Sequence, residues 1–469
     1  TAGLSRLFNS SAPKIQIVLK QGRQSSVAIV TVSGIRGIVN QDIDEMGATA
    51  FGVKFGNFLR SGTVAVAADT RKTAEMMKDA VISGLVFSGC RVFDLGFSST
   101  PSVFKEVSVK GLDGGVVVTS SHNPPEWNGI KFVIKPGRGV FESELRSIES
   151  ASTAPAPHFG NVFPNRASYV EILRNKAGRD SAKGVKVALD LAGGVGSLFI
   201  PKLISYQGSV VHALHGTPGI FPRIIDPTVD PLIALSHFVT SANCDVGFAY
   251  DCDADRLVIV DERGRKLSGD ATLLICLRYF LENTRNRQIV VSVDTSLSAE
   301  DLVREFNGKI IYSKVGEPNV VQKILENNSG AGGEGSSGGY IEPAFVTCRD
   351  GVYASTMILK LIKSEGSLSQ LLRQFTEYHQ DRGKAEIDRS IAGKILDRLA
   401  GTEREPDLTD GLKLRLSDKS WVLIRASNTE NVIRVSAEAK TAERSAELVR
   451  EYLRKINEIA SELSGTRRD

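Results

Sequence analysis

The chain has 469 residues, more than one hydrophobic core usually supports, which predicts roughly three domains. Its hydrophobic fraction of 41% and charged fraction of 24% are ordinary for a globular protein, and no apolar run approaches the ~18 residues of a membrane-spanning helix. Because the net charge of +4 is small and evenly spread, a membrane protein, a disordered scaffold and a basic nucleic-acid binder are all disfavoured.

The first 41 residues contain no Asp or Glu but several basic residues and serines. That composition is typical of organelle leaders, and a plain amino-terminal extension explains it equally well. The five cysteines are scattered without a CxxC pair, which argues against a disulfide framework or a zinc site and indicates a reducing compartment. We expect a cytoplasmic protein, with organelle targeting left open.

Strand and helix patterns alternate from residue 64 onward. Val64–Ala68 is predicted as a buried strand, Thr73–Ser88 as an amphipathic helix and Arg91–Leu95 as the next strand. This βαβ pattern implies a mostly parallel sheet with right-handed crossovers. The Ala/Pro stretch Ala151–Pro157 is predicted to be a linker.

Two more α/β patterns and a different carboxyl end follow. The predicted α/β elements are strands Lys186–Leu191, Ser209–Ala213 and Asp245–Tyr250, the hairpin Leu257–Leu267, helix Ala271–Asn283 and strand Ile289–Val293. Beyond these we expect short strands at Leu412–Leu416, Trp421–Ala426 and Val432–Ala437, then a long helix from Ala442 to about Leu463. The fold class is therefore α/β: three similar α/β domains with mixed sheets (27–153, 158–256, 257–366) and a carboxyl-terminal α+β domain (369–469).

A polar loop from Thr119 to Lys131 follows the apolar strand Gly115–Val118. Two prolines and a glycine forbid a regular element there, so the loop lies at the carboxyl end of a strand, where α/β sheets place ligand sites. Ser121 beside His122, with Lys131 further along, is a candidate nucleophile. A solvated turn explains these residues equally well.

Three aspartates, Asp251, Asp253 and Asp255, stand at alternate positions before Arg256. In an extended segment they face one side, and carboxylates so close repel one another unless a cation neutralises them. All-oxygen ligation favours Mg²⁺ or Ca²⁺. An EF-hand loop is the rival, because Glu262 is the twelfth residue, but the sixth is Arg256 instead of glycine and the flanks are strand-like. Mg²⁺ is preferred, and a bare acidic turn is the remaining alternative.

The segment Gly332–Gly339 is glycine-rich and contains Glu334 and Ser336. The glycines let the backbone approach a ligand closely, while the carboxylate and the hydroxyls can bind hydroxyl groups. A flexible linker is the alternative, weakened by the strand-like Tyr340–Ile341 that follows at once.

The segment from Arg425 to Glu430, with Arg434 beyond it, combines a guanidinium, an amide and hydroxyls. Such a turn suits a dianionic phosphate, although a polar turn between two strands is also open. Taken together, the four loops offer a nucleophile, a divalent metal site, a hydroxyl reader and a phosphate clamp. That combination predicts phosphoryl transfer on a phosphosugar.

The four loops, in this order and spacing, resemble those of the α-D-phosphohexomutase family, which contains phosphoglucomutase, phosphomannomutase and phosphoglucosamine mutase. The resemblance runs from about Val27 to Leu463. Supporting segments are Ser33–Gly37, Asp69–Arg71, Asp94–Gly96 before Thr100-Pro101, and Gly264-Arg265 before Gly269-Asp270.

The resemblance implies an isomerase that interconverts hexose 1-phosphate and 6-phosphate through a phosphoserine at Ser121 and a sugar bisphosphate. It implies Mg²⁺ held by Asp251, Asp253 and Asp255 against Ser121. It also implies a small-molecule phosphosugar as partner, and a monomer or homodimer. Glucose, mannose and glucosamine phosphates all stay open as substrates.

The same resemblance assigns roles to the remaining site residues. Arg36, His122 and Lys131 would surround the transferring phosphate, and Arg256 would neighbour the metal. Glu334 and Ser336 would read sugar hydroxyls, with Lys314 helping to orient the sugar. The non-reacting phosphate would be held by Arg425, Ser427, Asn428 and Thr429.

Three residues depart from the family pattern. Cys252 stands where glycine is usual, and a positive φ there would cost ~1 kcal/mol. The sugar loop has Gly339 where a histidine often follows Ser-Gly, and Asn431 replaces a proline.

Two alternatives to a mutase stay open: a sugar-phosphate phosphatase that loses the same phosphoserine to water, and a non-catalytic sugar-phosphate-binding homologue, which Cys252 suggests. We also expect a hinge near Lys363–Leu368 that would let the last domain close on a bound phosphate.

Overall fold

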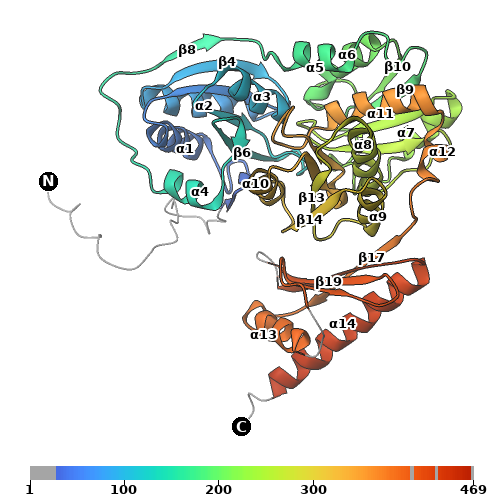
Figure 1. Cartoon of the computed structure of the whole chain (residues 1–469). Coiled ribbons are helices and arrows are strands. Elements are labelled where there is room, and N and C mark those ends of the chain that lie inside the picture. Colours follow the sequence, from blue (N-terminus) through green and yellow to red (C-terminus); the bar gives the residue numbers. More distant parts are fainter. Residues whose placement is uncertain (1–27, 402–405, 428–430, 466–469) are drawn as a thin grey trace.

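The computed structural model describes residues 28–401, 406–427 and 431–465 (Figure 1). The described chain forms four units in sequence order, each built on its own β-sheet. The predicted fold class, three α/β units with mixed sheets and a carboxyl-terminal α+β unit, is confirmed. In Figure 1 the first unit is blue, the second green, the third yellow to orange, and the red fourth unit stands apart below the others.

The first unit contains an extended mixed sheet with strand order β1-β2-β6-β5-β3-β4-β8, and β7 pairs with β6. Its elements are β1 (Ile29–Thr31), β2 (Gly34–Ile38), α1 (Glu45–Phe58), β3 (Thr63–Ala68), α2 (Ala74–Phe87), β4 (Arg91–Phe97), α3 (Thr100–Lys110), β5 (Gly114–Val118), β6 (Trp127–Ile134), β7 (Arg138–Gly139), α4 (Glu142–Glu149) and β8 (Asn161–Pro164). The central strands β3 and β5 are almost wholly buried because their apolar residues face helices on both sides.

The second and third sheets repeat one topology, with orders β10-β9-β11-β12 and β14-β13-β15-β16. In each, three parallel strands end in one antiparallel partner. The second unit contains α5 (Tyr169–Ala177), β9 (Lys186–Asp190), α6 (Ile200–Tyr206), β10 (Val210–Leu214), α7 (Ile233–Ser241), β11 (Val246–Tyr250) and β12 (Leu257–Asp261). The third contains α8 (Gly269–Asn283), β13 (Gln288–Ser292), α9 (Leu297–Glu305), β14 (Lys309–Ser313), α10 (Glu317–Asn327), β15 (Ala331–Glu334), β16 (Gly339–Ile341), α11 (Gly351–Glu365) and α12 (Leu368–Leu372).

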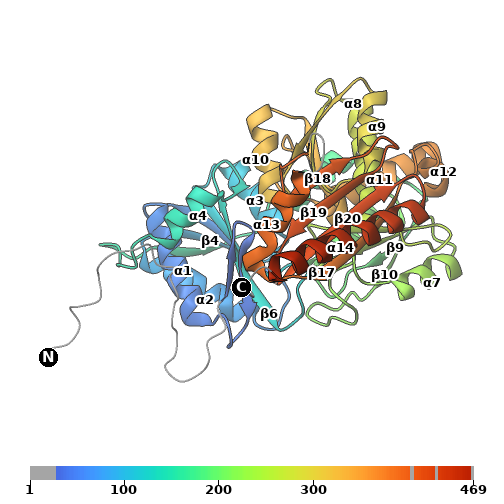
Figure 2. The same ribbon diagram turned by 90° about the horizontal axis from the view of Figure 1, so that it is seen from below.

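The fourth unit is an antiparallel sheet of order β17-β20-β19-β18, packed against α13 and α14. Its elements are β17 (His379–Glu386), α13 (Arg389–Ala400), β18 (Leu412–Arg415), β19 (Trp421–Ala426), β20 (Val432–Ala439) and α14 (Ala442–Gly465). This unit has a hydrophobic core of its own, whereas one continuous core joins parts of the first three units. Figure 2 shows the fourth unit lying across the other units, with α14 on its outer side.

The third and fourth units meet in a small mixed interface. Val293 and Leu297 of the third unit pack against Trp421 of the fourth. Around this apolar contact, Lys413 Nζ donates to the carbonyl oxygen of Val293 at 2.5 Å, and Glu438 Oε1 accepts from the amide of Leu297 at 2.7 Å. Charged side chains of the fourth unit therefore bind both ends of the segment that joins β13 to α9.

Two expected domain boundaries differ from the sheet membership. The strand β8 pairs with β4 of the first sheet although it lies beyond residue 158. The strand β12 pairs with β11, so it belongs to the second sheet and does not begin the third unit. The pattern could not predict β17, because its sequence His379–Glu386 alternates charged residues on an edge of the sheet.

The hinge near Lys363–Leu368 stays a prediction, although the chain does not leave the third unit at that position. Helix α11 ends within this segment, at Glu365, and Gly366 follows it with a φ of 100°. The next helix, α12, is nevertheless part of the third unit, because its Leu368 and Leu371 are buried in the core shared by the first three units. The chain passes to the fourth unit only after α12, along residues 373–378. There Ser298 Oγ binds the carbonyl oxygen of Thr376 at 2.6 Å.

Helices α1 and α2 cross closely because glycines face each other at the contact. A Cβ on Gly84 would lie 2.2 Å from the carbonyl oxygen of Thr49. We therefore predict that Gly84→Ala destabilises the first unit by about 1–3 kcal/mol, since backbone must move to admit one methyl group. Urea unfolding followed by the fluorescence of Trp127 in a Trp421→Phe background measures this change.

The matched control for this prediction is Gly393→Ala. Gly393 lies on α13, is exposed, and has open space where a Cβ would stand. Alanine there is expected to stabilise the helix by about 0.5–1 kcal/mol, a change followed by the fluorescence of Trp421 in a Trp127→Phe background. Unaltered stability of Gly84→Ala would show that the two helices are not held in this close contact.

Candidate active site

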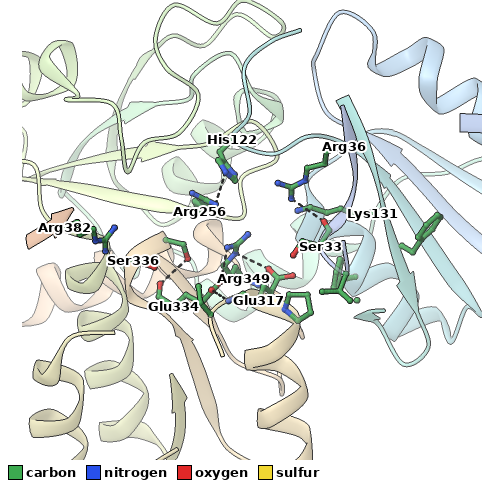
Figure 3. Close-up of a pocket in the computed structure, with 18 residues that line it drawn as sticks. Ser33, Arg36, His122, Lys131, Arg256, Glu317, Glu334, Ser336, Arg349 and Arg382 are labelled. Atoms are coloured by element: carbon green, nitrogen blue, oxygen red, sulfur yellow. Dashed lines mark hydrogen bonds and ion pairs between the residues drawn. The ribbon is translucent and has the colours of Figure 1, made fainter. Parts of the chain in front are cut away.

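Three loops from three sheets converge on one cavity of about 300 Å³. They are the serine loop (119–126, between β5 and β6), the metal loop (251–256, between β11 and β12) and the sugar loop (334–338, from the last residue of β15 to the start of β16). Figure 3 shows the polar side chains that converge there, namely Ser33, Arg36, His122, Lys131, Arg256, Glu317, Glu334, Ser336, Arg349 and Arg382.

Ser121 is completely buried, and its hydroxyl donates to Asp251 Oδ2 at 2.7 Å. Its backbone adopts a left-handed conformation with φ of 49°, which is uncommon for a residue other than glycine. Thr119 Oγ1 accepts from the Ser121 amide at 2.8 Å, and a guanidinium nitrogen of Arg71 donates to the Ser121 carbonyl oxygen at 2.7 Å. Surrounding contacts on both sides therefore hold a strained conformation that aims the hydroxyl at the metal loop.

Asp69 and Arg71 form the frame behind the serine loop. Arg71 Nε and Asp69 Oδ2 lie 3.0 Å apart, and neither side chain is exposed. Asp69 Oδ2 also accepts from Thr119 Oγ1 at 2.7 Å, while Arg71 donates to the carbonyl oxygen of Asn123 at 2.7 Å. The segment Asp69–Arg71 thus supports the serine loop without reaching the cavity lining.

Asp251, Asp253 and Asp255 are all fully buried, and each offers a carboxylate oxygen within 4.8 Å of those of the other two. Lys131 Nζ lies 3.0 Å from Asp253 and 3.3 Å from Asp255. Within the described residues, Asp253 Oδ1 and Asp255 Oδ1 are buried without a hydrogen-bond partner. Clustered, partly unpartnered carboxylate oxygens are the ligands that Mg²⁺ prefers, so these residues fit that ion.

The electrostatic environment differs among the three carboxylates. Burial, then the charges of Asp255 and Asp253, raise the pKa of Asp251 well above its ordinary value. Burial also disfavours ionisation of Asp255, but Arg349, Lys131 and Arg256 outweigh it and hold the pKa of Asp255 well below its usual range. The cations that surround the cluster thus keep negative charge on Asp255.

Arg256 links the metal loop to His122. Its guanidinium lies 3.0 Å from Asp226 Oδ2 and 3.4 Å from His122 Nε2, and His122 Nδ1 lies 3.4 Å from Ser121 Oγ. Burial, followed by the positive charge of Arg256, lowers the pKa of His122 to about 3. The imidazole is therefore neutral at physiological pH.

Basic groups in the cavity are available for an anion. Among the described residues, Arg36 Nε and Arg256 Nε are buried without a hydrogen-bond acceptor. Lys131 lines the same wall, and its neighbours Asp253 and Asp255 keep its pKa above the ordinary value although burial opposes this. Fixed positive charge next to Ser121 suits a phosphate group.

The sugar-loop residues Glu334 and Ser336 line the opposite wall (Figure 3). Glu334 Oε1 accepts from the amide of Gly316 at 2.6 Å, and Glu334 Oε2 lies 3.1 Å from Arg349 Nη1. Burial raises the pKa of Glu334, an effect that Arg349 opposes. Lys314 is exposed and does not line this cavity, and its expected contact with a sugar stays a prediction.

A second cavity, of about 400 Å³, is lined by strands of the fourth sheet and by Asp294 of the third unit. Arg425 lines it and lies 2.9 Å from Asp410 Oδ2. Ser427 is described and its amide donates to the carbonyl oxygen of Val432 at 3.0 Å, whereas Asn428 and Thr429 lie outside the described residues. Arg382 lines both cavities and so lies between the two groups of predicted site residues.

Comparisons with known proteins agree with this geometry along the chain. Four family models described as phosphoglucomutase/phosphomannomutase match in order: alpha/beta/alpha domain I over residues 28–157, domain II over 167–264, domain III over 268–378 and the C-terminal domain over 378–455. The chain belongs to the phosphoglucomutase/phosphomannomutase family. It is a phosphohexomutase, an isomerase of carbohydrate metabolism.

Individual members of the family match over nearly their full length. The phosphoglucomutase/phosphomannomutase of Thermococcus kodakarensis is 35% identical over 90% of this chain and 95% of its own. A probable phosphoglucosamine mutase of Methanopyrus kandleri is 33% identical over 92% of this chain and 98% of its own. The fold is similar to the crystal structure of a phosphoglucomutase/phosphomannomutase family protein from Burkholderia thailandensis, with a TM-score of 0.81, 24% identity and coverage of 92% and 98% of the two chains.

One departure from the family pattern has no backbone cost. Cys252 is not among the described non-glycine residues with positive φ, whereas Ala254, two residues on, has φ of 59°. The Cys252 side chain is fully buried, 3.8 Å from the hydroxyl of Thr70. The ~1 kcal/mol that a positive φ at Cys252 would cost therefore does not arise.

Sequence reasoning missed several residues of this phosphohexomutase site. Arg349, Glu317, Asp226 and Ser33 line the cavity or bind residues that do. Arg349 precedes the helix-capping Asp350, and Asp226 lies in a long irregular segment, so neither has a local pattern that marks it.

Among the described helices, none is long and apolar enough to cross a membrane.

Asp270 packs against Gly335 of the sugar loop, and its raised pKa predicts how the stability of the protein depends on pH. Its Oδ1 accepts from the amide of Ser296 at 2.9 Å, and a Cβ on Gly335 would lie 1.8 Å from that oxygen. Burial raises the pKa of Asp270 from 3.8 to about 7. Because the folded pKa exceeds the unfolded one, folding stability due to this group is present below pH ~4 and is lost as pH rises through 7.

We expect Asp270→Asn, whose amide oxygen still accepts from Ser296, to flatten this dependence. Relative to the variant, wild type should lose roughly 4 kcal/mol of unfolding free energy between pH 4 and 8, at about 1.4 kcal/mol per unit of pKa difference. Urea unfolding of both proteins across this pH range measures the difference. If the unfolding free energies of the two proteins changed with pH in the same way, ionisation of Asp270 would not destabilise the folded protein.

Proposed function

We propose that this phosphohexomutase carries its phosphoryl group on Ser121 and interconverts hexose 1-phosphate and 6-phosphate through a sugar bisphosphate. The observation that carries the proposal is the 2.7 Å contact of the Ser121 hydroxyl with Asp251, within a buried group of three aspartates. A serine so enclosed by carboxylates, beside Arg36 and Lys131, suits a phosphate that needs both a divalent ion and basic groups.

In the first transfer, phospho-Ser121 gives its phosphoryl group to the free hydroxyl of a sugar monophosphate. The bond between phosphorus and Ser121 Oγ breaks as phosphorus bonds to the sugar oxygen, and the hydroxyl proton ends on Ser121 Oγ. The second transfer reverses this exchange with the other phosphate of the bisphosphate. Lys131, Arg36 and Arg256 hold the phosphoryl oxygens during both transfers.

Mg²⁺, when bound, neutralises charge on the moving phosphoryl group. Asp251, Asp253 and Asp255 would hold it, together with the phosphate on Ser121. Neutral His122, between Ser121 and Arg256, contributes a hydrogen bond without adding charge.

Binding of the sugar would fall to the other two groups of residues. Glu334 and Ser336 accept or donate hydrogen bonds to ring hydroxyls in the first cavity. Arg425 and Ser427, with Asn428 and Thr429, hold the phosphate that is not reacting. Arg382 lines both cavities, so its guanidinium can contact a phosphate of the bisphosphate while the intermediate turns around between the two transfers.

The proposed substrates are glucose, mannose and glucosamine phosphates. Relatives at similar identity are named both phosphoglucomutase/phosphomannomutase and probable phosphoglucosamine mutase, so the names favour no single hexose. Turnover of the three 1-phosphates, measured side by side on one enzyme preparation, ranks them by kcat/KM.

Replacing Ser121 by alanine is predicted to abolish mutase turnover, because the phosphoryl group then has no carrier. Intact-mass analysis should find one phosphate on wild type, mapped to Ser121, and none on Ser121→Ala. The neighbouring hydroxyl supplies the control, since Ser120→Ala should keep the phosphate. Full activity of Ser121→Ala would be incompatible with the proposed function.

Replacing Arg425 by alanine is predicted to raise KM for the sugar 1-phosphate by about 10–100-fold, since charge-assisted phosphate contacts contribute about 1.5–3 kcal/mol. Ser121 should still carry phosphate, because Arg425 lies outside the serine-loop cavity. The control is Arg415→Ala, which removes an arginine paired with Glu300 elsewhere on the same sheet. A KM within twofold of wild type for Arg425→Ala would contradict the assigned role.

A further inference from the structure

Among the described arginines that line the cavity, Arg349 is the one whose ion pairs connect three separate segments. Its guanidinium lies 2.9 Å from Asp255 of the metal loop, 3.1 Å from Glu334 at the start of the sugar loop and 3.1 Å from Glu317 at the start of α10. Its side chain is 9% exposed, so these pairs are shielded from solvent. Figure 3 shows Arg349 between Glu334 and Glu317, below Arg256.

Each guanidinium nitrogen has a separate carboxylate. Nη2 donates to Asp255 Oδ2 and Nη1 donates to Glu334 Oε2, whereas Nε lies 3.1 Å from Glu317 Oε2 as an ion pair without a hydrogen bond. Because Oδ2 of Asp255 is taken by Arg349 and Lys131, the partner-free oxygen among the described contacts is Oδ1. Arg349, at the shorter distance, and Lys131 together leave Oδ1 of Asp255 available to a cation.

A glycine at the start of β16, directly after the sugar loop, leaves room for the side chain of Arg349. A Cβ on Gly339 would lie 2.2 Å from Arg349 Cδ and 2.7 Å from its Cγ. The stem of Arg349 therefore packs directly against the backbone of β16, and its head reaches across to the metal loop. A planar fork can donate to two carboxylates while it lies beside a third, which a lysine ammonium on its flexible stem cannot do in this fixed geometry.

We propose that Arg349 is a positioning residue that couples the sugar loop to the metal loop. The guanidinium divides its interaction between Glu334 and Asp255, so a change in the charge of Glu334 alters how strongly Arg349 binds Asp255. That in turn alters the affinity of the aspartates for Mg²⁺. Such a coupling free energy is reciprocal between the two loops. The inference rests on the proposed function for its Mg²⁺ site.

The test is a double-mutant cycle read by isothermal titration of Mg²⁺ alone into the full-length protein, with no turnover required. Glu334→Gln removes one carboxylate, so Arg349 interacts more strongly with Asp255 and competes with Mg²⁺. The dissociation constant for Mg²⁺ should rise about fivefold or more. In an Arg349→Gln background, the same Glu334→Gln change should alter that constant by less than about twofold.

Two results would overturn the proposal. An equal effect of Glu334→Gln in both backgrounds would mean that Mg²⁺ senses only the electrostatic field of Glu334. No effect in either background would mean that the two loops are independent. Failure of the proposed function looks different, because wild type would then bind no Mg²⁺ or carry no phosphate on Ser121.

The controls separate coupling from general damage to the fold. Arg278 pairs with Glu282 and Glu365 away from the cavity, so Arg278→Gln should leave the effect of Glu334→Gln intact. If Arg349→Gln does not fold, Arg349→Lys keeps the charge but reaches fewer carboxylates, and the effect of Glu334→Gln should shrink by at least half. An undiminished effect in Arg349→Lys would count against the coupling.

Discussion

Burial of three like charges is the constraint on which the rest of this structure depends. Asp251, Asp253 and Asp255 have no exposed surface and lie within 4.8 Å of one another. Removing a carboxylate from water costs several kcal/mol unless cations and hydrogen bonds compensate it. The compensating groups come from elsewhere: Lys131 from the first unit and Arg349 from the third. The metal loop is therefore stable only where three units meet, which is also where the cavity lies.

The convergence has a topological origin. In each of the first three sheets, a buried parallel strand runs into one antiparallel partner, and the connection between the two carries the functional loop. The serine, metal and sugar loops thus occupy equivalent places on β5–β6, β11–β12 and β15–β16. When the sheets pack around a shared core, equivalent ends face one another, and one architecture used three times supplies three different chemistries.

The sequence predicted the strands that are continuous apolar runs, and it predicted the loops because their residue types are unusual for turns. Asp251, Asp253 and Asp255 were identifiable because alternate carboxylates share a face in an extended segment. Arg349 and Asp226 were not, because single charged residues acquire meaning only through partners distant in sequence. The edge strand β17 was missed for a related reason: its charged residues give no hydrophobic alternation, and pairing with β20 alone defines it. The position of the connection to the fourth unit depended on the packing of α12, which no local signal reveals.

The left-handed backbone at Ser121 restricts which hydroxyl residue can occupy the position. Threonine carries an equivalent oxygen, but its branched Cβ is poorly tolerated at φ near 49°. Tyrosine would extend its hydroxyl several ångströms beyond Asp251, into a space that the metal loop already fills. Backbone conformation and the depth of the site thus select serine independently of its nucleophilicity, and an exchange that looks chemically conservative would be structurally disruptive.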